Sequence, residues 1–249
     1  MYNCILITGA SSGIGQSLAE YYAAPKITLI ITGRDKERLQ GVQKTCEAKG
    51  ATVVAKVIDV TDQAAMQAWL HKVDEKHPVD LLIANAGVRA NGSDPDRAEY
   101  DKVLKINLDG VLNTVWPIMQ RMKEHKAGHI AVTSSLASYR GYPKRGAYCA
   151  SKAAVKMLCE CWRLELEPYN IAVSTICPGF VKTRLTAGAA DLPLIMETEE
   201  SAKRIAKGLA KKKAVIAYPL PVFLLVRLLQ CLPVVVSDFF VRMAFKKRA

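Results

Sequence analysis

The chain has 249 residues, of which half are hydrophobic and 23% are charged, a composition that supplies one large core and excludes a disordered protein. Its formal net charge of +12 is uneven, because residues 203–249 carry eleven Lys and Arg and a single acid, Asp238. These basic residues lack interleaved aromatic side chains on which bases could stack, which disfavours a nucleic-acid partner.

Short apolar runs alternate with longer mixed segments along most of the chain, which predicts strands that alternate with helices. Strands are expected at residues 4–8, 27–32, 52–58, 80–84, 128–133, 171–177 and 214–217. Helices are expected at residues 16–24, 36–49, 63–76, 98–126, 147–167 and 199–210. Strands that are apolar throughout predict a parallel sheet covered by helices on both faces. We therefore expect one doubly wound α/β domain (a Rossmann fold) in residues 1–217, with residues 218–249 as an extension of it.

The cysteines and histidines give no sign of a disulfide framework or a metal site. The seven cysteines are odd in number and form no CxxC pair, so we expect reduced thiols, mostly in the core. The four histidines show no metal-ligand spacing, so no metal is expected. No basic leader precedes the first predicted strand, so we expect no signal peptide and a cytoplasmic location.

A glycine-rich turn with the pattern TGxxxGxG, residues 8–15, joins the first predicted strand to the first helix. Glycines allow a tight turn and the close approach of a pyrophosphate, and a helix N-terminus offers free N–H groups. This strand–turn–helix context favours a dinucleotide site over a glycine-rich turn without a ligand. The candidate cofactor residues here are Gly9, Ser11, Ser12, Gly13, Ile14 and Gly15.

The residues after the second predicted strand indicate which dinucleotide is bound. An NAD enzyme usually places an acid there for the ribose 2′-hydroxyl, but this position aligns with Gly33, and Arg34 follows it. A guanidinium can hold a 2′-phosphate, so the pattern favours NADP(H). A shift of one residue would make Asp35 the acid and favour NAD(H) instead. We interpret Asp35 as the N-cap of the helix that follows.

Four polar residues form a candidate catalytic set. Tyr148 and Lys152 lie on one face of a predicted helix, and the ammonium should lower the pKa of the phenol below about 10, as proton transfer requires. Lys152 can also hold the nicotinamide ribose. Ser135 follows a strand at the sheet edge where such folds bind ligands, and its hydroxyl can bond a substrate oxygen. Asn107 is a polar residue inside a predicted helix, where the alternative is a local kink.

Together these motifs resemble the short-chain dehydrogenase/reductase family over residues 5–185. Three further motifs match the family: Asp59 with Val60, the run Asn85, Ala86 and Gly87, and residues 178–183, which include Pro178, Gly179, Val181 and Thr183. The resemblance implies that Asp59 and Val60 contact adenine and that residues 85–87 support the sheet beside the cofactor. It further implies that Asn107 orders a water for a proton relay through Lys152 and that residues 178–183 close over the nicotinamide. The implied strand order is 3-2-1-4-5-6-7.

The predicted function is NADP(H)-dependent interconversion of a carbonyl and a secondary alcohol, with Tyr148 as general acid/base and Ser135 on the reacting oxygen. Residues 184–200 are small and apolar, and are expected to shape a site for a lipophilic substrate. One alternative is an NAD-dependent alcohol dehydrogenase. Another is a nucleotide-sensing regulator without catalysis, which the complete catalytic set disfavours. The family resemblance implies a homodimer or homotetramer.

The C-terminal extension is apolar and basic. Prolines interrupt the apolar run at residues 218–236, and the uninterrupted part at residues 222–232 is too short to span a bilayer. Ser237 is expected to cap a last short helix with Asp238, Arg242 and Lys246 on one face. We expect this tail to lie on an anionic membrane surface as a peripheral contact, or to roof a lipophilic pocket. The alternatives are packing on a neighbouring subunit and a solvated basic helix face. The last basic cluster is Lys246, Lys247 and Arg248.

Overall fold

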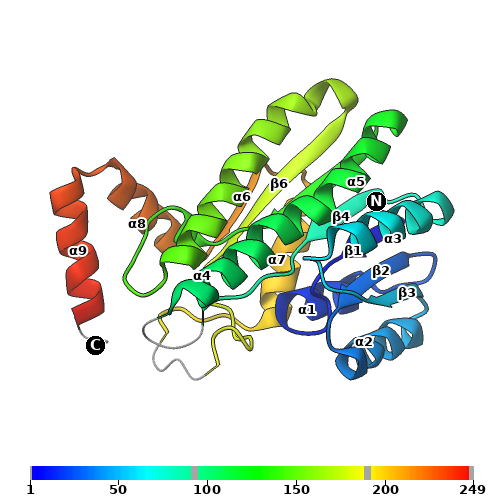
Figure 1. Cartoon of the computed structure of the whole chain (residues 1–249), viewed down its shortest axis with the longest axis horizontal. Helices are drawn as coiled ribbons and strands as arrows, with labels where there is room; N and C mark the ends of the chain where they lie inside the picture. Colours follow the sequence, from blue (N-terminus) through cyan, green and yellow to red (C-terminus); the bar gives the residue numbers. More distant parts are fainter. Residues whose placement is uncertain (1, 91–94, 188–191, 247–249) are drawn as a thin grey trace.

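The computed structural model describes residues 2–90, 95–187 and 192–246, and its centre is a seven-stranded sheet (Figure 1). The strands are β1 (Cys4–Ile7), β2 (Thr28–Gly33), β3 (Thr52–Val57), β4 (Leu81–Ala84), β5 (Gly128–Thr133), β6 (Ile171–Pro178) and β7 (Val215–Tyr218). All neighbours are parallel, in the order β3-β2-β1-β4-β5-β6-β7. The predicted fold class and strand order are therefore confirmed.

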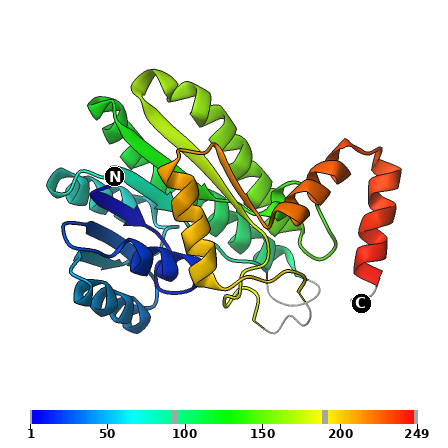
Figure 2. The ribbon, with the colours of Figure 1, turned by 180° about the vertical axis from the view of Figure 1, so that it is seen from behind.

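Helices cover both faces of this sheet. They are α1 (Gly13–Tyr22), α2 (Lys36–Ala48), α3 (Gln63–Lys76), α4 (Arg97–Leu104), α5 (Gly110–His125), α6 (Gly146–Glu165), α7 (Thr198–Ala210), α8 (Leu220–Cys231) and α9 (Val234–Lys246). Side chains of a strand point alternately to its two faces. Leu6 of β1 accordingly packs with residues of α3, α5 and α6, whereas Ile5 and Ile7 pack with residues of α1, α2 and α7. Seen from behind, α7 crosses the second face (Figure 2).

The helix boundaries follow from local hydrogen bonds. Asp35 caps α2, because its carboxylate accepts a hydrogen bond from the backbone N–H of Arg38 at 3.0 Å. The predicted N-cap is thus confirmed. Asp62 and Asp96 cap α3 and α4 in the same way.

The single helix predicted for residues 98–126 is interrupted. The structure has α4, a π-helical turn at Lys105–Asp109, and then α5. The buried Asn107 lies in this turn, and its side chain both donates to and accepts from the backbone of Val88, at 2.8 Å each. A π-turn inserts one residue into a helix and often marks a functional site. The structure thus shows a local kink at Asn107 and a bond to a backbone carbonyl, and the catalytic role of Asn107 stays a prediction.

The C-terminal tail forms two helices that project from the body (Figures 1 and 2). Pro219 precedes α8, and the side of α8 against the body packs on Leu136, Tyr139 and Cys177. The prediction that Ser237 caps the last helix is wrong. The helix begins at Val234, and the N–H of Ser237 already bonds to the carbonyl of Pro233 at 3.0 Å. Within the described ranges, no helix is long and apolar enough to cross a membrane.

Candidate active site

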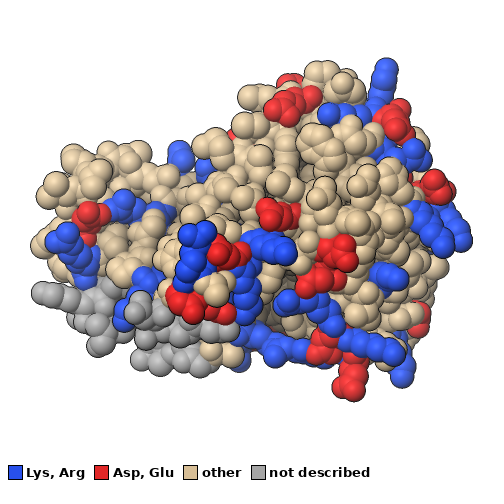
Figure 3. All heavy atoms as spheres, viewed as in Figure 1, with Lys and Arg blue, Asp and Glu red and all other residues tan. Residues whose placement is uncertain are grey.

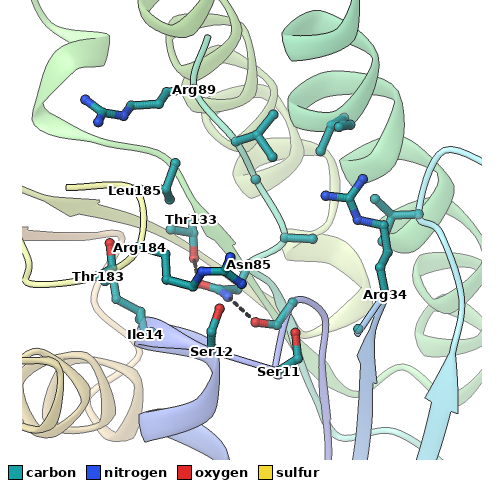
Figure 4. Close-up of a pocket in the computed structure, with 18 of the residues that line it drawn as sticks. Ser11, Ser12, Ile14, Arg34, Asn85, Arg89, Thr133, Thr183, Arg184 and Leu185 are labelled. Carbon is teal, nitrogen blue, oxygen red and sulfur yellow. Dashed lines mark hydrogen bonds between the residues drawn. The ribbon is translucent and has the colours of Figure 1, made fainter. Parts of the chain in front are cut away.

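A cavity of about 650 Å³ opens at the carboxyl ends of the strands, beside the central pair β1 and β4. The predicted site residues that line it are Gly9, Ser11, Ser12, Gly13, Ile14, Gly33, Arg34, Asp59, Val60, Asn85, Ala86, Gly87, Tyr148, Lys152, Pro178, Gly179, Val181 and Thr183. The remaining three, Gly15, Asn107 and Ser135, are not among the lining residues but are neighbours of residues that are. Residues far apart in the sequence are thus brought to one site (Figure 4).

The glycine-rich turn after β1 needs its glycines for space and for backbone conformation. Gly9 has φ +68°, and a Cβ atom there would lie 2.8 Å from the Cα of Ala86. Gly13 has φ +60° and opens α1, so the free N–H groups of the helix begin at the cavity. A Cβ atom at Gly15 would lie 2.3 Å from the carbonyl oxygen of Gly9. Gly15 therefore allows α1 to pack against the turn.

Asn85 ties three strand ends together beneath the cavity. Its side-chain amide donates to the carbonyl of Thr8 at 3.1 Å, and its carbonyl oxygen accepts from the hydroxyl of Thr133 at 3.2 Å. Its backbone N–H bonds to the hydroxyl of Thr8 at 3.1 Å. The contacts thus join β1, β4 and β5 at one point.

The end of β2 forms a basic corner of the cavity. A Cβ atom at Gly33 would lie 2.9 Å from the hydroxyl of Ser11, so the absence of a side chain allows Ser11 to pack against the end of β2. Arg34 is exposed and lies 3.6 Å from the carboxylate of Asp59. Figure 4 shows Arg34 on the side of the pocket opposite Thr183. Burial raises the pKa of Asp59, but hydrogen bonds from Thr61 and the charge of Arg34 outweigh it and lower the pKa overall.

Two cavity-lining arginines, Arg38 and Arg89, were missed by sequence reasoning, whereas a third, Arg184, lies in the segment 184–200 that was predicted to shape the substrate site. Arg38 lies one helical turn after Arg34, and its guanidinium is held by the Asp35 carboxylate, with Nε 2.7 Å away. A basic residue in the first turn of the helix after β2 was a signal for Arg38. Arg89 lies on a loop that no local pattern places at the cavity.

Tyr148 and Lys152 both come from the first turns of α6. The Nζ atom of Lys152 lies 5.9 Å from the centre of the Tyr148 ring and donates to the carbonyl of Thr133 at 2.7 Å. Lys152 is buried, and burial lowers its pKa to about 8. The ammonium is therefore fixed against the end of β5, directly beside the phenol.

The pKa of Tyr148 differs from the sequence-based expectation. Burial raises the pKa of this phenol above its usual range, against the lowering effects of a hydrogen bond with Ser135 and the charge of Arg89. The expected value below about 10 is therefore not met, because desolvation of the phenolate outweighs the hydrogen bond with Ser135 and the charge of Arg89. The phenol is protonated at neutral pH.

Ser135 and Asn107 are the other two residues of the predicted catalytic set, and they lie near Tyr148 and Lys152, respectively. Ser135 is buried just after β5, and its hydroxyl accepts from the N–H of Ala137 at 3.1 Å. Asn107 also donates to the hydroxyl of Ser151 at 3.0 Å. A Cβ atom at Gly87 would lie 3.2 Å from both the Asn107 carbonyl oxygen and the Lys152 Nζ. Both polar groups therefore converge on Gly87.

Comparisons with known proteins agree with this arrangement. A model of the short chain dehydrogenase family matches residues 3–192. The chain is 34% identical over 237 residues to an uncharacterized oxidoreductase of Myxococcus xanthus, and the match covers 93% of each chain. A short-chain dehydrogenase from Sphingobium yanoikuyae in complex with NADPH has a TM-score of 0.80 and 28% identity, over 87% of this chain and 88% of that one. A short chain dehydrogenase/reductase from Burkholderia phymatum in complex with NAD has a TM-score of 0.82 and 26% identity, over 90% and 92%.

The chain belongs to the short-chain dehydrogenase/reductase family. It is accordingly an oxidoreductase of the class that interconverts alcohols and carbonyl compounds with NAD(P)(H).

Proposed function

We propose that the protein reduces the carbonyl group of a lipophilic small molecule with NADPH, or oxidises the matching secondary alcohol with NADP, and that Tyr148 is its acid/base. The observation that carries this proposal is that Tyr148 and Lys152 line the same cavity as the glycine-rich turn. The phenol of Tyr148 bonds to Ser135 at the end of β5. One cavity thus holds a dinucleotide cradle and a proton donor.

The residues of the cavity fit a dinucleotide. Gly9 and Gly13 have the positive φ angles of a phosphate-binding turn, and α1 begins at the second of them. Arg34 and Arg38 line the cavity beside Ser11 and Gly33, where their guanidinium groups could hold a 2′-phosphate. Asp59 and Val60 would flank the adenine, and Pro178, Val181 and Thr183 the nicotinamide. When bound, the nicotinamide supplies or accepts the hydride.

In the proposed mechanism, the side chains around Tyr148 transfer the proton to and from the substrate oxygen. In reduction, Tyr148 donates its phenolic proton to the substrate oxygen, while the hydroxyl of Ser135 donates a hydrogen bond to the same oxygen. The raised pKa of Tyr148 keeps the phenol in the form that donates. The ammonium of Lys152 stabilises the phenolate that remains. Asn107 and Lys152 converge beside Gly87, where an ordered water would return a proton to Tyr148.

The preference for NADP(H) rests on the basic corner. Asp35 is engaged by the N–H and guanidinium of Arg38, so its carboxylate serves the helix and not a ribose hydroxyl. Arg34→Ala should weaken NADPH binding by about tenfold to a hundredfold and leave NADH nearly unchanged, because it removes a charge-assisted hydrogen bond. Both dissociation constants would be measured by fluorescence, with Lys203→Ala on the exposed side of α7 as the matched control. Equal losses for the two cofactors would refute the assignment of Arg34.

The substrate class is tested by direct assay. Of residues 184–200, Arg184, Leu185, Thr186 and Ala187 line the cavity, and Gly188, Ala189, Ala190 and Asp191 lie outside the described residues. Oxidation of NADPH would be followed with a panel of alkyl and aryl ketones, aldehydes and 3-oxoacyl thioesters of rising chain length. We expect turnover that increases with apolar length and falls at least about a hundredfold in Ser135→Ala. Turnover of none of them, or an unaffected Ser135→Ala variant, would contradict the proposed function.

We also propose that the protein forms a homodimer or homotetramer through the outer faces of α5 and α6. Large apolar side chains are exposed there, namely Trp116, Met157 and Leu164. Apolar side chains of this size on adjacent helices are typical of subunit contacts. Sedimentation velocity would measure the subunit number, and a monomer at micromolar concentration would contradict this proposal.

A further inference from the structure

The two C-terminal helices expose a nearly continuous apolar surface, which we call the tail surface. It consists of Leu220, Leu224, Leu225 and Leu228 of α8 and Val234, Val235, Val236, Phe239, Phe240 and Met243 of α9. Val235 is 81% exposed and Phe239 is 59% exposed. The projecting lobe at the left of Figure 3 is accordingly mostly uncharged. Exposed apolar patches of this extent mark an interaction site.

The tail surface is held facing outward by contacts on the opposite side of the same helices. Val222, Phe223 and Val226 of α8 pack on the cluster of Leu136, Tyr139 and Cys177. An ion pair between Asp238 and Arg140 links α9 to the body. None of the described residues that line the active-site cavity comes from α8 or α9. The tail therefore does not roof the cavity in this structure, and the tail surface is directed at something outside the chain.

The charges around the tail surface identify a negatively charged partner. Residues 220–249 contain five basic residues, Arg227, Arg242, Lys246, Lys247 and Arg248, against one acid. That acid, Asp238, is already neutralised by Arg140. Arg242 lies in α9 and Arg227 in α8, where the guanidinium of Arg227 lies over the ring of Tyr139 on the body-facing side; Lys247 and Arg248 lie outside the described residues. An apolar surface on a segment with a net positive charge matches an anionic lipid surface.

The lengths of α8 and α9 favour contact with the surface of a bilayer over a span through it. The helices α8 and α9 have 12 and 13 residues, and the described part of the chain holds no helix that could span a bilayer. Helices of this length can lie in the plane of the lipid headgroups with their apolar faces down. A second copy of the chain fits less well, because pairing two tail surfaces would bring two sets of like charges together.

We propose that the tail surface docks the protein on an anionic lipid bilayer, with Phe239 and Phe240 inserted at the level of the headgroups. The docking depends on no catalytic residue, so its test is independent of the proposed enzymatic function. Because α8 packs on the residues that directly follow Ser135, docking also brings the side of the active site that holds Ser135 close to the lipid.

The test is co-sedimentation of the full-length protein with phosphatidylcholine vesicles, with and without phosphatidylserine, at low and high salt. We expect binding to the phosphatidylserine vesicles at low salt, which weakens as salt screens the cations. The double variant Phe239→Glu/Phe240→Glu should bind at least about tenfold more weakly. The matched control is Tyr21→Glu, an exposed aromatic residue of α1 that lies outside both the tail surface and the proposed subunit contact, and this variant should bind like the wild type.

A second measurement places the aromatic side chains directly. In a Phe240→Trp variant, the fluorescence of the new tryptophan should be quenched by brominated lipid in anionic vesicles. Absence of sedimentation at low salt, equal sedimentation of the double variant, or an unquenched tryptophan would each overturn the proposal. If the wild type does not bind vesicles and the double variant changes the subunit number, the tail surface contacts a second copy of the chain. This result also overturns the proposal.

Discussion

Replacing Lys152 by Met should change how the stability of the protein depends on pH. Burial lowers the pKa of this lysine from 10.5 to about 8, so the folded state loses the proton before the unfolded state does. A group with a lowered folded pKa contributes stability that is present above its unfolded pKa and is lost as pH falls through its folded pKa. Between about pH 7 and pH 10, the wild type should therefore gain about 2.5 kcal/mol of unfolding free energy relative to Lys152→Met.

The assay is urea unfolding of both proteins at several pH values and one protein concentration. The difference in unfolding free energy isolates Lys152, because the other titrating groups are common to both proteins. Val155→Ala, a buried apolar change on the same helix, should shift stability by an amount that does not vary with pH. A wild-type to Lys152→Met difference that stays constant across this range would refute the claim that the ammonium is held desolvated beside Tyr148.

Two further substitutions test the cradle and the π-turn. Gly9→Ala should destabilise the fold by about 1–3 kcal/mol and weaken NADPH binding, whereas Gly41→Ala, which has open space on α2, should stabilise it by about 0.5–1 kcal/mol. Thermal unfolding measures the stability of the two variants, and titration measures their NADPH binding. The same change in stability for Gly9→Ala and Gly41→Ala would show that the Gly9 backbone is unstrained. Asn107→Ala leaves the N–H and carbonyl of Val88 without their partner, so it should lower the unfolding free energy by about 2 kcal/mol and remove most of kcat. The control Asn113→Ala removes a single hydrogen bond to the carbonyl of Val60 and should leave kcat intact. An Asn107→Ala variant with wild-type kcat and stability would refute the claim that Asn107 holds the π-turn and takes part in catalysis.

The sheet and the phosphate turn were predictable because their signals are local. Apolar runs marked every strand to within two residues at each end, and the glycines of the first turn stood between a strand and a helix. Parallel strands end at one edge of a sheet, so the position of Ser135 just after a strand was enough to place it at that edge. The cap at Asp35 was predictable for the same reason, because the helix after it begins at the next residue.

The remaining features depend on contacts between distant residues. The π-turn at Asn107 is fixed by Val88, which no helical periodicity reveals. Burial raises the pKa of Tyr148, and the sequence does not reveal this burial. The spacing between Tyr148 and Lys152 indicated only a nearby positive charge, which would lower the pKa. The start of α9 was misplaced because Pro233 initiates the helix four residues before Ser237, which looked like the better cap. The position of α8 against Tyr139 is a packing result that the apolar run alone did not specify.

The most direct test of the central claim is the Tyr148→Phe variant, assayed for both cofactor binding and turnover of the best ketone from the panel. We expect kcat to fall by at least about a thousandfold, because the proton donor is gone, while the dissociation constant for NADPH changes by less than about threefold. Tyr100→Phe, a change of the same kind in the hydrophobic cluster beside Tyr148, should leave both quantities near the wild-type values. A Tyr148→Phe variant that keeps most of its kcat would contradict the assignment of Tyr148 as the acid/base.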